Sequence, residues 1–203
     1  MKKNNVTIWS ESPLLGRGRG EASHRFPITV LFLCFCMGMV AKAPKYVFYF
    51  IGDGMGLNQV VATQYYLQSC EGELGITSLC FAQFPYTGFA TSYSASSDVT
   101  DSAAGGTALA TGHKTYNGAI GVTSDGTPVT SVAEWAHRSG VKVGVVTSVT
   151  INHATPASFY AHQKSRNDYY EIGTQLAASG FEFFAGGDFA EKTNADVQNK
   201  YKF

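Results

Sequence analysis

Four short apolar runs, each followed by a loop rich in glycine or polar residues, constrain the fold of this chain more than any other feature. The first, Lys45 to Ile51, holds only aromatic and β-branched residues after its lysine, which is typical of a strand buried in a parallel sheet. The others cover residues 87–93, 141–147 and 181–185. Helical patterns separate them, after Gly56 and at residues 102–111, 131–137, from 156, and 169–178. This alternation predicts an α/β fold, a three-layer α/β/α sandwich around a mostly parallel sheet.

The carboxyl ends of the predicted strands are where we expect the chemistry of such a sheet. This rule selects four loops: Gly52–Gly56, Ser94–Ser102, Ser148–Thr155 and Gly186–Asp188. The candidate functional residues are therefore sought in these loops and in the helices that follow them.

Ser102 stands at the start of an alanine-rich helix that Gly112 is placed to end. Asp101 and Ser102 are both good helix caps, and a group at this position faces free backbone N–H donors and the positive end of the helix dipole. That environment suits a phosphate or another anion. An ordinary capped helix packed through small residues remains the alternative.

Asp53 lies between Gly52 and Gly54, directly after the first apolar run. A dinucleotide-binding turn has a different glycine spacing, and a carboxylate inside it would repel a pyrophosphate. A carboxylate presented on bare backbone suits a divalent cation. An aspartate turn without a ligand is the structural alternative.

Three further polar residues follow the third predicted strand. His153 and Thr155 are two residues apart and could face one way from an extended loop, although Thr155 could simply cap the helix before Pro156. His153 is either a ligand or a polar loop residue. The guanidinium of Arg166 can grip a phosphate in two places, unless it is an ordinary surface arginine. His113, His137 and His162 lack partners at metal-ligand spacing and are predicted to be structural.

Activation of Ser102 as a nucleophile points to a metal. The G-x-S-x-G pattern of a catalytic-triad serine is absent, and the preceding aspartate is not a strong base. Lowering the pKa of an alcohol towards 7 needs roughly 12 kcal/mol, whereas a hydrogen bond supplies about 1–3 kcal/mol. A metal ion is the better candidate.

The first 43 residues differ from the rest of the chain. Basic residues precede an uncharged run, Ile28 to Val40, and small residues follow at Ala41 and Ala43, the order of a secretory signal. We therefore expect residues 1–43 to be a signal peptide or N-terminal extension, and the protein to be periplasmic or secreted. The run is too short for a comfortable membrane span. An oxidising compartment would permit a disulfide between Cys70 and Cys80, and two unpaired buried thiols are the alternative.

Charge composition disfavours nucleic acid as a partner. Lysine plus arginine number 15 and aspartate plus glutamate also number 15, so the chain has no net positive charge to attract a polyanion.

Three motifs taken in order carry a resemblance to a known family. They are residues 51–56 (IGDGMG), residues 100–108 (TDSAAGGTA) and residues 153–157 (HATPA) with Ala161, His162 and Arg166. Together they resemble the alkaline phosphatase family, and the likeness runs from about Lys45 to Asp188. Residues 44–203 would then be the N-terminal portion of an alkaline phosphatase domain, with the fold of that family.

The resemblance implies a centre of two zinc ions and one magnesium ion. Asp53 would ligate one zinc and the magnesium, and Thr155 would ligate the magnesium. His153 stands where some members of the family carry an acidic residue, and it would lie beside the third metal. Ser102 would bind zinc as the nucleophile and become phosphorylated in the reaction.

Substrate binding is implied in the same way. Arg166 would hold the phosphate oxygens of a phosphate monoester, and Asp101 would orient Arg166. The implied reaction is an in-line displacement at a two-metal centre, with a phosphoserine intermediate.

The resemblance also implies that the chain is truncated. The family draws its remaining histidine and carboxylate ligands from a C-terminal half, and no histidine follows His162 here. We therefore expect the chain to be inactive alone, and the full-length protein to be a homodimer. The alternatives are an inactive remnant with weak metal or phosphate binding, a phosphodiesterase or sulfatase relative of the same fold, and, third, a nucleotide-binding module.

Overall fold

The structure is a computed structural model that describes residues 44–190 of the chain. It divides into two compact units, Met1–Phe50 and Ile51–Phe203. In the first unit only residues 44–50 are described, and they have no regular secondary structure. All the helices and strands below belong to the second unit, which also holds every candidate site residue.

The second unit begins with a helical segment that is little buried. Helix α2 (Leu57–Cys70) follows the turn at Gly56 and contains no buried residue. A short 3₁₀ helix, η1 (Cys80–Gln83), comes next. Cys70 and Cys80 are both free and exposed, so the thiols are neither bonded to one another nor buried.

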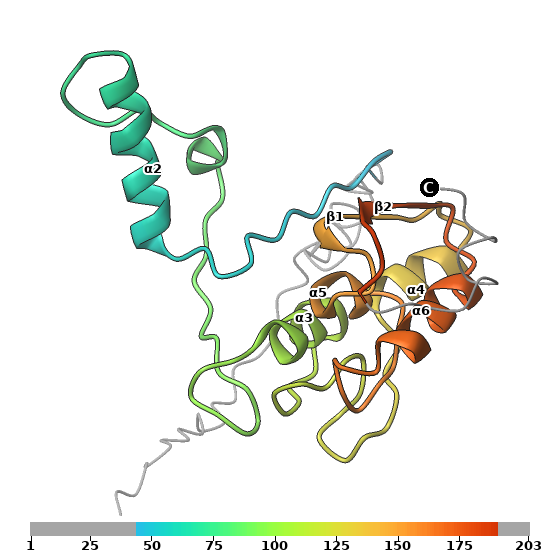
Figure 1. Cartoon of the computed structure of the whole chain (residues 1–203). Coiled ribbons are helices and arrows are strands. Elements are labelled where there is room, and N and C mark those ends of the chain that lie inside the picture. The colour runs from blue at the N-terminus through green and yellow to red at the C-terminus, as the bar shows by residue number, and fades with distance from the viewer. Residues whose placement is uncertain (1–43, 191–203) are drawn as a thin grey trace, which may run out of the picture. The chain divides into compact units, whose positions relative to one another are not determined.

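Helix α3 (Ser102–Thr111) has the ends that its sequence predicts. Asp101 caps it by accepting a hydrogen bond from the Ala104 N–H, and Gly112 ends it in the left-handed conformation with φ of 75°. Its small residues let another helix approach closely. A Cβ on Gly106 would lie 2.7 Å from Ser158 Oγ, just after helix α5 (Ala154–Ala157). Figure 1 shows α3 and α5 side by side, and this packing brings the start of α5 towards Ser102.

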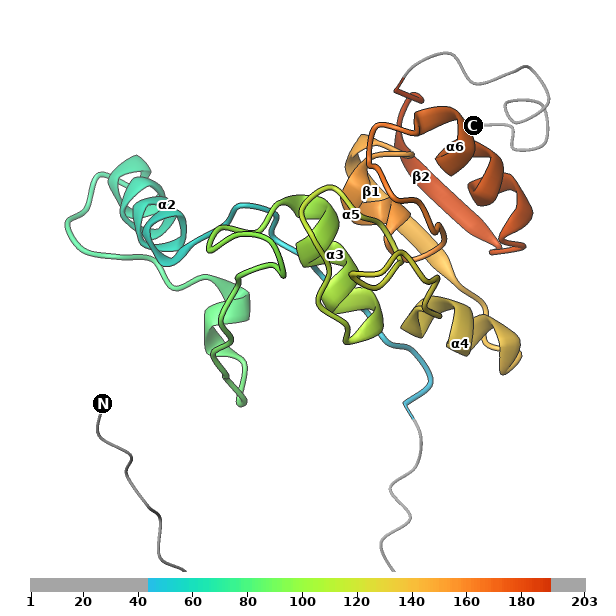
Figure 2. The ribbon, with the colours of Figure 1, turned by 90° about the horizontal axis from the view of Figure 1, so that it is seen from below.

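Two parallel strands form the sheet of the described residues. Strand β1 (Gly144–Thr150) pairs with β2 (Phe183–Gly187), with Gly144 opposite Phe183 and Val146 opposite Ala185. Helices α4 (Val132–Arg138) and α6 (Tyr169–Ala178) precede these strands along the chain, and Figure 2 shows them with the sheet from a second direction. The order helix, strand, helix, strand matches the predicted α/β class.

The core lies between α3, α5, α6 and the sheet. Tyr160 is buried in it and donates a hydrogen bond of 2.7 Å from its hydroxyl to the Ile151 carbonyl, which ties the segment after α5 to the end of β1. The largest fully buried apolar side chains are Ile120, Val122, Ile151, Ile172 and Leu176. This core fixes β1, and with it the loop that carries His153.

Two predicted strands are not strands in the structure. Residues 45–51 and 87–93 have no strand assignment, and their aromatic side chains face solvent, with Phe50 86% and Phe89 92% exposed. Both predictions were therefore wrong. A strand needs backbone hydrogen bonds to a neighbouring strand, and apolar residues alone do not supply them. The two remaining strands begin two or three residues later than the apolar runs suggest.

The start of α5 also differs from the prediction. The helix begins at Ala154 with His153 as its N-cap residue, so Pro156 is the third helical residue rather than the first. Proline is tolerated there because the first-turn N–H groups have no partner within the helix. Thr155 is therefore not a cap, and its hydroxyl is available for another contact. Across residues 44–190, no helix has the length and apolar character needed to cross a membrane.

Candidate functional site

Asp53 is the point where three separate segments of the chain meet. Its Oδ1 accepts a hydrogen bond of 3.1 Å from Ser102 Oγ, at the first residue of α3. Its Oδ2 accepts one of 2.7 Å from Thr155 Oγ1, in the first turn of α5. One carboxylate and two hydroxyls thus converge on one place. Because Asp53 precedes Gly54, whose φ is 70°, the chain turns sharply there and leaves the carboxylate exposed.

Asp101 and Arg166 form an ion pair beside Ser102. Arg166 Nη1 donates to Asp101 Oδ2 at 3.0 Å, and the two side chains are 25% and 24% exposed. Burial alone would raise the pKa of Asp101, but hydrogen bonds from the Ala104 and Gly118 N–H groups and from Arg166 outweigh it and lower that pKa. Asp101 is therefore a carboxylate that both caps α3 and anchors the guanidinium.

His153 holds the other end of the guanidinium. Arg166 Nη2 lies 3.2 Å from His153 Nε2, and because arginine only donates, Nε2 must accept. The proton of a neutral His153 then sits on Nδ1, which is buried and has no hydrogen-bond partner among the described residues. Burial lowers the pKa of His153 and the charge of Arg166 lowers it further, while Asp53 opposes both. The ring is therefore neutral near pH 7.

The six residues selected from the sequence thus form one closed circuit. Hydrogen bonds link Thr155 to Asp53, Asp53 to Ser102, Asp101 to Arg166 and Arg166 to His153. Along the chain, Asp101 directly precedes Ser102, and His153 lies two residues before Thr155. The predicted loop Gly186–Asp188 has a different role: the Asp188 carbonyl accepts a hydrogen bond from the Ile151 N–H, and its carboxylate contacts the Phe189 N–H.

A cation fits one side of this circuit. A carboxylate and two hydroxyls are the hard oxygen donors that Mg²⁺ prefers. Zinc takes mainly nitrogen and sulfur ligands, and the described residues contain no group of three or more histidine, cysteine, aspartate or glutamate side chains able to hold a metal. His153 offers no free nitrogen lone pair in this arrangement, because Nε2 accepts from Arg166 and Nδ1 carries the proton. By the chemistry of their donor atoms, Asp53, Ser102 and Thr155 suit magnesium, and the described residues do not by themselves fit two zinc ions.

Two residues that sequence reasoning treated only as a turn also belong to the site. The Gly118 N–H donates to Asp101 Oδ2 at 3.0 Å, and the Gly118 carbonyl accepts from the Arg166 N–H at 2.7 Å. The side chain of Asn117 accepts from the Asp101 N–H at 3.2 Å and donates to the Val99 carbonyl at 3.0 Å. The Asn-Gly pair signals a turn, but nothing in the sequence indicates which distant residues the turn contacts.

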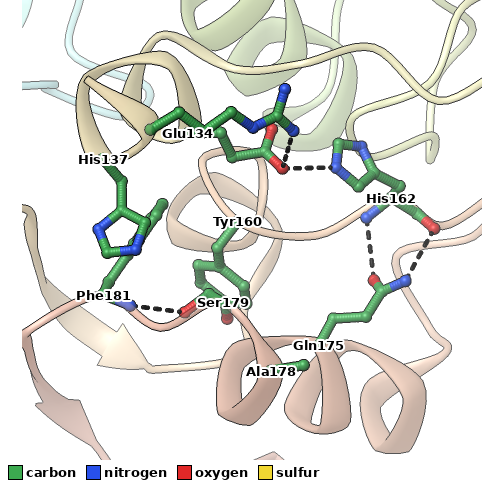
Figure 3. Close-up of a pocket in the computed structure, with 9 residues that line it drawn as sticks. Glu134, His137, Tyr160, His162, Gln175, Ala178, Ser179 and Phe181 are labelled. Carbon is green, nitrogen blue, oxygen red and sulfur yellow. Dashed lines mark hydrogen bonds and ion pairs between the residues drawn. The ribbon is translucent and has the colours of Figure 1, made fainter. Parts of the chain in front are cut away.

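A separate hollow of about 250 Å³ lies between α4 and α6 and shares no lining residue with the circuit (Figure 3). His162 lines this hollow, with Nε2 3.1 Å from Glu134 Oε1 and Nδ1 2.8 Å from the Gly121 carbonyl. Both neighbours can accept, so protonated His162 can donate from both nitrogens. Its hydrogen bond to Glu134 raises its pKa, and the Gly121 carbonyl adds to this against the effect of burial. His162 is thus structural, as the sequence predicts.

Comparison with known proteins gives consistent results. The sequence model of the family described as alkaline phosphatase matches residues 44–193. Alkaline phosphatase 4 of Drosophila melanogaster is 39% identical over 153 residues, covering 70% of this chain and 25% of the relative. The tissue-nonspecific isozyme of Homo sapiens is 36% identical over 136 residues, covering 62% of this chain and 26% of the relative.

Solved structures agree with the sequence relatives. The alkaline phosphatase of the Antarctic bacterium TAB5 superposes with a TM-score of 0.61 at 44% identity, covering 68% of this chain and 38% of the other. A mutant of that enzyme, solved with Mg bound, gives a TM-score of 0.62 at 40% identity and covers 75% of this chain and 40% of the other. The chain thus spans about a quarter of the length of the curated relatives that it matches. Its α/β fold is that of these enzymes, and the chain belongs to the alkaline phosphatase family.

Proposed function

We propose that this chain carries the nucleophile and the phosphate-binding residues of a metal-dependent phosphatase acting on phosphate monoesters. The observation that supports this most strongly is the Asp53–Ser102 hydrogen bond of 3.1 Å at the start of α3. It directs the hydroxyl proton towards the carboxylate, so that the lone pairs of Ser102 Oγ are free for an incoming phosphorus atom. Membership of the alkaline phosphatase family supports the same reaction class.

Arg166 would bind the substrate phosphate. Each terminal nitrogen of a guanidinium carries two N–H bonds, and in Arg166 one on each nitrogen is used, towards Asp101 and towards His153. The second N–H of each remains for two oxygens of one phosphate. The start of α3 adds the positive end of its dipole beside Ser102. A dianionic phosphate monoester is the ligand that this combination suits.

The proposed reaction proceeds in two displacements. Ser102 Oγ loses its proton to solvent and forms a bond to phosphorus as the bond from phosphorus to the ester oxygen breaks, and the leaving alkoxide takes up a proton from solvent to become the alcohol. Water then attacks the phosphoserine, releasing inorganic phosphate and restoring the Ser102 hydroxyl. The two steps replace one difficult hydrolysis, and Arg166 holds the transferred group throughout.

Asp53 and Thr155 would hold a magnesium ion, with His153 close by, and Asp53 and Ser102 would face a zinc ion. A bound divalent cation would neutralise the charge that develops on the reacting oxygens. For the whole protein the proposed cofactors are two zinc ions and one magnesium ion. The oxygens of Asp53, Ser102 and Thr155 account for one of these cations.

Hydrolysis of 4-nitrophenyl phosphate at alkaline pH with zinc and magnesium tests this proposal. Turnover that is abolished both by a chelator and by Ser102→Ala, but kept in the exposed control Ser124→Ala, is the expected result for an active chain. The 203-residue chain is expected to be inactive alone, so this pattern should appear in a form extended to the length of its relatives. Failure of both forms would favour an inactive remnant. Preference for bis(4-nitrophenyl) phosphate or 4-nitrophenyl sulfate would instead favour a phosphodiesterase or sulfatase.

Export and assembly complete the proposal. The order of residues 1–43, which lie outside the described part of the chain, supports cleavage of a signal peptide and a periplasmic or secreted location. N-terminal sequencing of the exported protein tests this. The full-length protein is proposed to be a homodimer, which sedimentation equilibrium would measure.

A further inference from the structure

The side chain of Asn117 bridges two backbone groups, one on Asp101, which anchors Arg166, and one on Val99, two residues before it. Its Oδ1 accepts from the Asp101 N–H at 3.2 Å, and its Nδ2 donates to the Val99 carbonyl at 3.0 Å. The Asn117 N–H in turn donates to Ser96 Oγ at 3.0 Å. One exposed side chain thus sets the path of the loop that leads into α3.

The next residue contacts both members of the ion pair. The Gly118 N–H donates to the Asp101 carboxylate, and its carbonyl accepts from the Arg166 N–H at 2.7 Å. Gly118 has φ of 93°, a conformation that glycine adopts at little cost. The turn therefore lies directly between Asp101 and Arg166, and a shift of Asn117 would move its contacts to both.

Residues after the turn are fixed independently to two other parts of the fold. Ile120 exchanges two backbone hydrogen bonds of 2.8 Å with Gln163, on the segment that carries Arg166. The Gly121 N–H donates at 2.9 Å to Thr107 Oγ1, a fully buried hydroxyl of α3. Because these contacts fix one end of residues 117–121 firmly, Asn117 controls the other end, where the turn meets Asp101.

Packing does not explain these contacts of Asn117. Asn117 is exposed, whereas Ile120 and Thr107 nearby are fully buried. Its bonds go instead to backbone groups of the loop at residues 97–101. The side chain acts on the direction of Asp101 more than on the stability of the fold.

We propose that Asn117 is a positioning residue that holds the Asp101–Arg166 pair in the geometry needed to grip a phosphate group. The role in phosphate binding rests on the proposed function, but the positioning itself does not. Asn117 touches neither the substrate nor the reacting atoms. It acts through the Asp101 backbone and the Gly118 turn.

Restricted rotation of the Arg166 guanidinium gives a test that needs no activity. Nitrogen-15 NMR of the 203-residue chain measures how fast the terminal nitrogens exchange, and a guanidinium held at both ends rotates slowly. We expect Asn117→Ala to speed the rotation of Arg166 severalfold and to speed hydrogen exchange of the Gly118 N–H. The matched control is Asn167→Ala, at an asparagine that is also exposed, lies next to Arg166 in the chain and donates its backbone N–H to the Ser165 hydroxyl. It should leave both rates unchanged.

Unchanged Arg166 rotation and Gly118 exchange in folded Asn117→Ala would overturn the proposal. Should that variant fail to fold, Ser96→Ala carries the test, because it removes the hydroxyl that accepts from the Asn117 N–H, together with a longer contact of 3.4 Å to Ser94 Oγ. A smaller increase in both rates is expected there, and no increase overturns the proposal.

Hydrolysis supplies a second, separable readout. In a form that turns over, Asn117→Ala should lower kcat/KM for a phosphate monoester about tenfold, in line with the cost of displacing a substrate-binding group. It should also weaken inhibition by inorganic phosphate. A form extended to the length of its relatives that still lacks turnover would count against the proposed function, while the NMR rates would still decide the role of Asn117.

Discussion

The two halves of the site differ in how firmly the chain holds them. In the anion half (Asp101, His153 and Arg166), the guanidinium of Arg166 is hydrogen-bonded to Asp101 and to His153. The backbone N–H of Arg166 also donates to the Gly118 carbonyl. In the cation half (Asp53, Ser102 and Thr155), Asp53 is exposed, and within residues 44–190 its carboxylate accepts hydrogen bonds from two hydroxyls. The anion half is therefore held by several contacts within the chain, whereas the cation half is held by fewer of them.

The largest effect is expected when the anion half loses its anchor. Asp101→Ala removes the cap of α3 and leaves the partly buried Arg166 and Gly118 N–H donors without their carboxylate. A cap contributes about 1 kcal/mol and a charged hydrogen bond about 1.5–3 kcal/mol, so the free energy of unfolding should fall by about 2–4 kcal/mol. Urea denaturation measures it. The exposed Asp98→Ala should change it by less than about 0.5 kcal/mol. Equal losses of unfolding free energy in Asp101→Ala and Asp98→Ala would show that Asp101 does not stabilise the anion half.

Two adjacent glycines of α3 allow a sharper test of the packing under the site. A Cβ at Gly106 would meet Ser158 Oγ at 2.7 Å, whereas one at Gly105 would meet nothing closer than Thr100 Cγ2 at 3.5 Å. Gly106→Ala should therefore destabilise the fold by about 1–3 kcal/mol, because the added methyl group would keep α3 and the segment at Ser158 from packing as closely as they do. Gly105→Ala should stabilise it by about 0.5–1 kcal/mol, since alanine loses less entropy in a helix. Thermal unfolding that ranked them in the opposite order would contradict the observed contact.

The Glu134–His162 pair predicts a pH dependence of stability outside both halves. Because the folded pKa of His162 is raised, its contribution is fully present below its usual value of 6.5 and is lost as pH rises through the raised pKa. The pKa of Glu134 is lowered, because hydrogen bonds from His162 and Ser131 outweigh its burial. Its contribution is present above its usual value of 4.5 and is lost as pH falls through the lowered pKa. Stability from the pair should therefore be greatest between about 4.5 and 6.5.

Glu134→Gln isolates this effect, because glutamine can still accept from the Ser131 N–H at the start of α4. The unaltered chain should lose more stability than Glu134→Gln as pH rises from 6 to 8, measured by urea denaturation at each pH. Parallel losses would mean that the pair carries no charge-dependent stability.

The smallest effect is expected in the cation half without metal. Asp53→Asn should change the unfolding free energy by less than about 0.5 kcal/mol in chelator, because the carboxylate is exposed. In millimolar magnesium the unaltered chain should gain thermal stability by mass action, whereas Asp53→Asn should gain less. Asp98→Asn serves as the control for general salt effects. Identical magnesium responses in all three proteins would contradict a cation site at Asp53.

Local signals in the sequence predict the helices well. Asp101 and Gly112 bound α3 as expected, and the predicted helix at residues 169–178 coincides with α6. These ends depend on capping and on glycine conformation within a few residues. The apolar runs at residues 45–51 and 87–93 did not become strands, because strand formation depends on distant partners that a local pattern does not specify.

The candidate site also has residues that the sequence predicts and contacts that depend on distant parts of the chain. The rule about strand ends and the family motifs selected Asp53, Ser102 and Thr155, and the structure brings their oxygens together. The sequence does not predict the pairing of His153 with Arg166, because the two residues are 13 positions apart and neither helical nor strand periodicity relates them. Asn117 was visible only as a turn residue, because its contacts depend on the loop before α3.

The order of chain segments around the circuit also bears on how the protein folds. The Asp101–Arg166 bond joins residues 65 positions apart, and the Thr155–Asp53 bond joins residues 102 positions apart. Closing loops of this length costs entropy before any contact repays it, so helices such as α3 and α6 are expected to form first. The circuit is then among the last parts to assemble on the folding pathway. A phosphate analogue that binds to it would thus recognise only chains whose folding is complete.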